Sequence, residues 1–180
     1  MIDYPALWQA VLELPSHRTA YSVHGPEHWK RVERNALILS TDSGADPDVV
    51  RLFALFHDAR RINEWQDPEH GARGAALAAS FRGELFELSD ESFEILVYAC
   101  TWHTKGKHHK NPTIATCWDA DRLDLGRCGM TPNPAYMSTT LAKTIAEHGY
   151  IDPWLHLANI TMDTSIISVL KTQYCRPIHA

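Results

Sequence analysis

No apolar run in the 180 residues approaches the length that a membrane-spanning helix needs. The first residues also lack the pattern of a secretion signal, because Asp3 and Pro5 stand where such a signal has positive charge and an unbroken apolar stretch. Internal repeats, low-complexity tracts and linker-like segments are missing too. We therefore expect one domain that stays in the cytoplasm and does not bind a membrane.

An excess of positive charge is also lacking. The net charge is −5 and the pI is about 6.1, so no global basic field would hold a nucleic-acid backbone, and duplex DNA is not an expected partner. A local basic segment is present at Lys105, Lys107 and Lys110. Cysteines are few, widely spaced and without a C-x-x-C pair, which indicates reduced core thiols at Cys100, Cys117, Cys128 and Cys175.

Proline placement is the clearest sign of secondary structure. A proline at the first helical position loses no hydrogen bond and fixes a helical φ. Six pairs fit this placement, and the first five lead into apolar residues at helical spacing: Tyr4-Pro5, Gly25-Pro26, Asp46-Pro47, Asp67-Pro68, Asn111-Pro112 and Asp152-Pro153. The sequence predicts an all-α, single-domain bundle of roughly six to eight helices over residues 1–180, with C-terminal helices in 131–180 packing on the rest.

Histidine is abundant, with 11 residues, and one of them ends a strongly apolar segment next to a carboxylate. His57 and Asp58 stand four residues after Phe53 and Ala54, so both polar side chains continue faces that bury apolar residues. Buried polar groups of this kind must be paired or bound to a metal. The alternative is a helix C-terminus at the surface, where a histidine favours the helix dipole.

Two other helices carry an inward-facing polar side chain. His28 precedes Val32 by four residues on the apolar stripe of its helix, and Asp121 interrupts the apolar stripe of the segment 113–125. Asp119 lies on the opposite side of that helix, whereas Asp124 is close enough to support the site indirectly. Imidazoles and carboxylates from three helices are typical ligands of one divalent metal ion.

His28, the pair His57-Asp58 and the segment Ala120-Asp121-Arg122-Leu123 resemble the H…HD…D signature of the HD-domain superfamily. The resemblance covers roughly residues 20–130, which form the motif-bearing core. It implies an all-helical metal-binding core whose ligands are His28, His57, Asp58 and Asp121. It also implies hydrolysis of phosphate esters, usually in nucleotides or related small molecules.

Two further histidines are candidates for a second ion. His70 resembles an H-x-x-x-G element of members with two metal ions, and His103 ends a helix where such members also place a ligand. With a single ion, both would instead contact phosphate or orient the ligands. We expect one ion and keep two as the alternative, the metal being Mn, Fe, Zn, Ni, Co or Mg.

A bound divalent ion would activate water, and the transferred phosphoryl group would then need cations. Asp58 and Arg61 are the expected catalytic residues, with His24 as a general acid at the site mouth. Arg61 and Arg122 are the expected substrate-binding residues. For Arg61 the alternatives are a surface pair with Glu64, or replacement by Arg60; for Arg122 the alternative is a structural ion pair. Arg31 is expected to buttress the site.

Two other functions fit the same ligands. One is a regulatory module that binds metal and nucleotide without turnover, and the other is a di-iron oxygenase of the HD type. The oxygenases place a histidine ligand where this chain has Arg61, which counts against an oxygenase. A homodimer is compatible with the sequence, which does not specify the oligomeric state.

Overall fold

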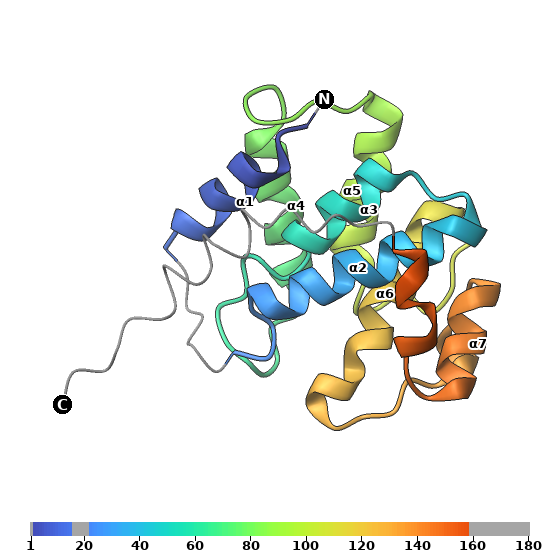
Figure 1. The fold of residues 1–180 in the computed structure, drawn as a ribbon. Coiled ribbons are helices and arrows are strands. Elements are labelled where there is room, and N and C mark those ends of the chain that lie inside the picture. Colours follow the sequence, from blue (N-terminus) through green and yellow to red (C-terminus); the bar gives the residue numbers. More distant parts are fainter. Residues whose placement is uncertain (1, 16–21, 159–180) are drawn as a thin grey trace.

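The computed structural model describes residues 2–15 and 22–158, and the described residues form a bundle of α-helices (Figure 1). None of them belongs to a β-strand, and a single isolated bridge joins Arg82 and Phe86. The described chain contains seven α-helices, which confirms the predicted fold class: α1 (Tyr4–Glu13), α2 (Pro26–Ser43), α3 (Pro47–Phe56), α4 (His70–Phe81), α5 (Asp90–Trp102), α6 (Pro112–Leu123) and α7 (Thr140–His148). Three short 3-10 helices accompany them: η1 (Asp124–Cys128), η2 (Pro134–Tyr136) and η3 (Asp152–Leu157).

Side-chain caps explain where several helices begin. Asp46 accepts hydrogen bonds from the backbone N–H groups of Asp48 and Val49 at the start of α3, and Asn111 does the same at the start of α6. Proline follows the N-cap of both helices, as predicted. The pair Asp67-Pro68 instead stands before a turn, and α4 begins at His70. Asp152-Pro153 opens only a 3-10 helix.

The centre of the bundle is built from α2, α3 and α6. Helix α2 packs against both α3 and α6, and α5 packs against α3, α4 and α6 (Figure 1). Every residue from Leu52 to Phe56 of α3 is fully buried, so the helix that ends at His57 runs through the core. Trp29 of α2 and Trp118 of α6 fill the core on either side. The apolar packing therefore fixes the end of α3, where His57 and Asp58 stand.

Two glycines let α4 approach its neighbours closely. A Cβ atom at Gly71 would lie 2.2 Å from the carbonyl oxygen of Cys100 in α5, and one at Gly74 would lie 2.2 Å from the carbonyl oxygen of Phe56 in α3. Real side chains never come so close, so only glycine permits these contacts. This packing brings His70, at the start of α4, against the ends of α3 and α5.

The C-terminal part of the described chain packs on the core through α7, which lies against α2 and α6. Of the segment 131–180, whose helices were predicted to pack on the core, residues 159–180 lie outside the described part of the chain. No helix in the described part of the chain is both long and apolar enough to cross a membrane.

Candidate metal centre

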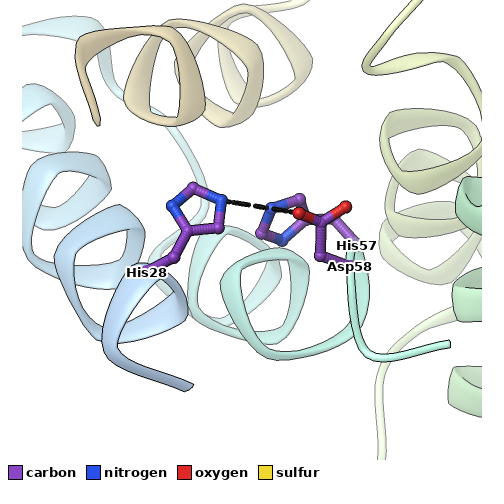
Figure 2. Close-up of side chains that lie close together, drawn as sticks. All are labelled: His28, His57 and Asp58. Atoms are coloured by element: carbon purple, nitrogen blue, oxygen red, sulfur yellow. Dashed lines mark hydrogen bonds and ion pairs between the residues drawn. The ribbon is translucent and has the colours of Figure 1, made fainter. Parts of the chain in front are cut away.

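A histidine of α2 meets a histidine and an aspartate at the end of α3 in the core (Figure 2). His28 stands in the first turn of α2, His57 caps the C-terminus of α3, and Asp58 follows directly. The Nε2 atoms of His28 and His57 lie 3.1 Å apart, and Oδ2 of Asp58 lies 3.6 Å from the first and 3.7 Å from the second. All three side chains are buried, so bulk water does not solvate them.

Asp121 of α6 joins the same group. Its Oδ1 atom lies 3.3 Å from Nε2 of His28 and 3.9 Å from Nε2 of His57. The facing imidazoles hold the pKa of Asp121 well below its ordinary value although burial raises it, so the carboxylate is ionised. The structure thus brings together the four side chains that the sequence singles out as metal ligands, which we call the first cluster.

The outer nitrogens of both imidazoles are already used. Nδ1 of His28 donates to Oδ2 of Asp124 at 2.7 Å, and Nδ1 of His57 donates to the carbonyl oxygens of Phe53 and Ala54, each at 3.1 Å. Because these partners can only accept, the ring proton sits on Nδ1 and each neutral ring presents a lone pair at Nε2. Two lone pairs 3.1 Å apart repel each other unless a cation, either a metal ion or an extra proton, lies beside them.

A second cluster lies on the other side of Asp58. Nε2 of His70 lies 2.9 Å from Nε2 of His103 and 3.1 Å from Oδ1 of Asp58, which is 3.7 Å from His103. The outer nitrogens again face acceptors, since Nδ1 of His70 donates to the carbonyl oxygen of Asp67 and Nδ1 of His103 to that of Cys100. The second cluster thus has two converging imidazoles and one carboxylate oxygen, as the first has. It differs in that Nη1 of Arg61 lies 3.3 Å from Nε2 of His70 and places a guanidinium cation beside it.

Asp58 is shared by the two clusters, one through each oxygen. Its Oδ1 atom is buried and has no hydrogen-bond donor among the described residues. Burial raises the pKa of Asp58, but the surrounding imidazoles hold it well below its ordinary value. A buried anionic oxygen without a donor is costly unless a cation binds it. Each oxygen of Asp58 thus belongs to one of two groups of side chains that could hold a metal ion, and the cation nearest Oδ1 is Nη1 of Arg61 at 3.6 Å.

The protonation of the histidines agrees with one cation per cluster. Burial lowers the pKa of His57 to about 3, so this ring is neutral. Burial also opposes the charge of His28, but its hydrogen bonds to Asp121 and Asp124 raise its pKa above the ordinary value. Asp58 raises the pKa of His103 in the same way. In the absence of metal, each cluster thus has one imidazole that is ready to hold an extra proton.

Asp124 and two arginines surround the first cluster. Nε of Arg31 donates to Oδ1 of Asp124 at 2.7 Å, which is the buttressing role predicted for Arg31. Arg127 was not predicted from the sequence to lie near the site, but its Nη2 atom lies 3.9 Å from Oδ1 of Asp121. Arg127 follows Asp124 by three residues, which is the spacing of neighbours on one face of a helix. This spacing indicates a contact only because the chain stays helical past Leu123, in η1.

Asp119 lies on the side of α6 opposite Asp121 and, as this position predicts, makes contacts outside the clusters. Its carboxylate accepts hydrogen bonds from the backbone N–H groups of Ser138 at 2.9 Å and Thr139 at 2.7 Å, and from the Thr139 hydroxyl. Thr139 is the N-cap of α7. Asp119 therefore fastens α7 to α6 and takes no part in the clusters.

Arg61 lies beside the second cluster. Its Nη1 atom is 3.6 Å from Oδ1 of Asp58, and its other nitrogens donate to the carbonyl oxygens of Trp65 at 2.8 Å and Asn63 at 3.3 Å. The structure does not pair it with Glu64, the alternative that the sequence left open. Arg60 donates to the carbonyl oxygen of Pro15 and has no contact with either cluster among the described residues.

Arg122 is directed away from the clusters. Its guanidinium donates to the carbonyl oxygens of Gly106, Lys107 and Tyr136 and lies 3.9 Å from Oδ1 of Asp119. These contacts correspond to the structural alternative, and the substrate-binding role of Arg122 stays a prediction that they do not support. The residue order could not show this, because the carbonyl groups belong to loops far along the chain.

His24 lies in the loop before α2, next to the first cluster. Its ring centroid is 6.4 Å from that of His28, and its Nδ1 lies 3.0 Å from Oε2 of Glu64. Glu64 thereby links this loop to the segment after Asp58, a contact that the sequence did not predict. The side chain of His24 is 16% exposed, so it lies between the buried clusters and solvent.

Neither family models nor searches of curated proteins and of solved structures give a match for this chain. A function for the protein must therefore be inferred from the geometry of the two clusters and from the resemblance in the motif residues.

Proposed function

We propose that the protein is a metal-dependent phosphohydrolase of the HD type, with His28, His57, Asp58 and Asp121 as ligands of its first ion. The observation that carries the proposal is the convergence of two imidazole lone pairs and two ionised carboxylates in a buried space. Neutral nitrogens together with anionic oxygens suit Mn, Fe, Zn, Ni, Co or Mg to different degrees. Asp121 is the most exposed of the four ligands. An open coordination position of the ion would therefore meet solvent on the side of the first cluster where Asp121 lies.

A second ion would be held by His70, His103 and the other oxygen of Asp58. Here too, two imidazole nitrogens face Oδ1 of Asp58, which has no hydrogen-bond partner among the described residues and lies 3.6 Å from Nη1 of Arg61. Held through the two oxygens of Asp58, a pair of ions would supply charge stabilisation for both the attacking and the leaving oxygens of a phosphate. This arrangement favours two ions over the single ion expected from the sequence.

The chemistry assigned to the bound ions is the activation of water and the polarisation of a phosphoryl oxygen at neutral pH. The protein's own side chains would stabilise charge on the phosphoryl group and transfer protons. Arg61, fixed by two carbonyl oxygens, presents Nη1 beside Asp58 and is placed to stabilise charge on the phosphoryl group. Burial lowers the pKa of His24, and its Nδ1 faces Glu64, so the neutral ring would present an unprotonated Nε2 to the site. This favours acceptance of a proton from water over the general-acid role expected from the sequence. The substrate class is a nucleotide or another small phosphate ester.

Metal analysis combined with a turnover screen tests the proposal. The purified protein is loaded with each candidate metal and assayed on a phosphomonoester, a phosphodiester and nucleotides. We expect bound metal and hydrolysis, and we expect both to be lost in His57→Ala but kept in His156→Ala, which alters an exposed histidine of η3. Tight nucleotide binding without turnover would instead indicate a regulatory module, and dioxygen consumption by the iron form would indicate an oxygenase.

A further inference from the structure

Exposed apolar side chains gather on two segments that adjoin the clusters. Trp65 is 86% exposed and Ile62 is 52% exposed, both in the segment after Asp58, and Val23 in the loop before α2 is 38% exposed. The two segments touch, since the backbone N–H of Val23 donates to Oε2 of Glu64 at 3.3 Å. Single exposed apolar residues are ordinary. Here three of them lie on two segments that touch each other beside the clusters.

The backbone of Trp65 is held close to the second cluster. Its carbonyl oxygen accepts from Nη2 of Arg61 at 2.8 Å, while Nη1 of the same guanidinium is 3.6 Å from Oδ1 of Asp58. The N–H of Trp65 donates to Oδ1 of Asn63 at 2.8 Å, which closes the turn. One guanidinium group therefore separates the Trp65 backbone from the carboxylate that both clusters share.

The indole ring of Trp65, in contrast, has no aromatic or cation–π partner among the described residues. Trp102 shows the ordinary case of a tryptophan at the surface. It is 42% exposed, and its ring lies near the ring of Tyr98 (6.4 Å between centroids) and under Nζ of Lys105 (5.6 Å). Trp8, Trp29 and Trp118 are at most 2% exposed. Trp65 thus keeps a fixed backbone and a free ring beside the candidate site.

We propose that Trp65 is a specificity-determining residue that stacks on an aromatic ring of the substrate. The inference rests on the proposed function, which places the phosphate at the clusters and Arg61. A group joined to that phosphate through a sugar would then reach the indole next to Arg61. Stacking on an indole favours any base because every base has a π-face. The substrate is thereby narrowed from phosphate esters in general to nucleotides, with sugar phosphates disfavoured.

Binding of two matched phosphonates tests the inference. The 5′-phosphonates of adenosine and of ribose carry the same head group and sugar and differ only in the base, and their P–C bond resists hydrolysis. Calorimetry on the Zn²⁺-loaded protein avoids dioxygen chemistry, since Zn²⁺ has no redox activity. We expect the adenosine compound to bind roughly tenfold to a hundredfold more tightly, the range that one base–aromatic stack gives. Trp65→Ala should remove most of this difference and leave the affinity for the ribose compound unchanged.

Trp102→Ala is the matched control, and it should preserve the preference for the adenosine compound. Equal affinity of the wild type for the two compounds would overturn the inference and leave the proposed function standing. So would an unchanged preference in Trp65→Ala, or a change in its sedimentation coefficient, which would mean that the ring contacts a second copy of the chain. If the wild type retains no metal and binds neither compound, the proposed function itself fails.

Discussion

Asp124 accepts a hydrogen bond from Nδ1 of His28 at 2.7 Å, although the two residues are 96 positions apart in the chain. This bond fixes the tautomer that presents Nε2 to the first cluster. Asp124→Asn replaces an anionic acceptor by a group that can also turn a donor towards the ring. We expect metal affinity at the first cluster to fall roughly tenfold to a hundredfold, as measured by competition with a chromogenic chelator. An unchanged affinity would show that His28 keeps its orientation without this carboxylate.

Asp121 and Asp119 are two positions apart in the chain and lie on opposite sides of α6. Asp121→Ala should lose the ion of the first cluster, as measured by elemental analysis. Asp119→Ala should keep the metal but lose about 2 kcal/mol of unfolding free energy in urea, because the partly buried N–H groups of Ser138 and Thr139 lose their acceptor. Equal metal loss in both variants would contradict the placement of the ligands on α6.

His103 belongs only to the second cluster. His103→Ala should reduce the bound metal from two ions to one, since the first cluster keeps its four ligands while His70 and Asp58 alone hold an ion weakly. The measurement is the metal content after gel filtration at low free metal. Retention of two ions would mean that His103 is not a ligand, and His109→Ala, in the basic loop, serves as the control.

Gly71 is required for the approach of α4 to α5. In Gly71→Ala the new Cβ would meet the carbonyl oxygen of Cys100 at 2.2 Å, and the backbone must move to relieve the overlap. We expect a loss of about 3 kcal/mol of unfolding free energy, together with weaker binding of the second ion. Gly126→Ala is the control, because a Cβ there meets nothing within 4 Å. Similar stability of both variants would mean that α4 can shift without cost.

Metal removal should have an effect on stability that depends on pH. In the metal-free protein, His28 and His103 have pKa values raised above the ordinary 6.5, so their protonation stabilises the fold fully below 6.5. This contribution is lost as the pH rises through the raised values. Metal ions, in contrast, need the unprotonated rings and bind more tightly as the pH rises.

The difference in melting temperature between metal-loaded and chelator-treated protein should therefore grow as the pH increases above 6.5. At free metal about a hundredfold above Kd, the stabilisation from one ion is about 2.7 kcal/mol. Thermal scans at a series of pH values measure it. A difference that stays constant or shrinks with rising pH would argue against ligation by these histidines.

The helices could be predicted because their signals are local. Asp46-Pro47 and Asn111-Pro112 place a capping side chain and a fixed φ at two helix starts, and the structure has both caps. The inward directions of His28 and Asp121 followed from the apolar stripes of their helices. Spacing along one helix tells which residues share a face, so these predictions needed no tertiary information.

The contacts between loops could not be predicted in this way. The pair His24–Glu64 joins residues 40 positions apart, and Arg122 donates to carbonyl groups of two separate loops. The sequence shows that such residues are charged, but it does not show the path that a loop takes in three dimensions. The sharing of Asp58 by two clusters likewise depends on the close packing of α4, which isolated glycines in a sequence do not reveal.

Three of the four imidazoles in the clusters are aimed by their own backbone. His57, His70 and His103 each donate from Nδ1 to a carbonyl oxygen three or four residues earlier in the chain. The rotation of each ring is thus set by contacts within a single turn of chain, and tertiary packing sets the separation between the rings. A substitution that shifts one helix end as a unit would therefore change the distance between the nitrogens and leave each ring's direction relative to its own helix unchanged.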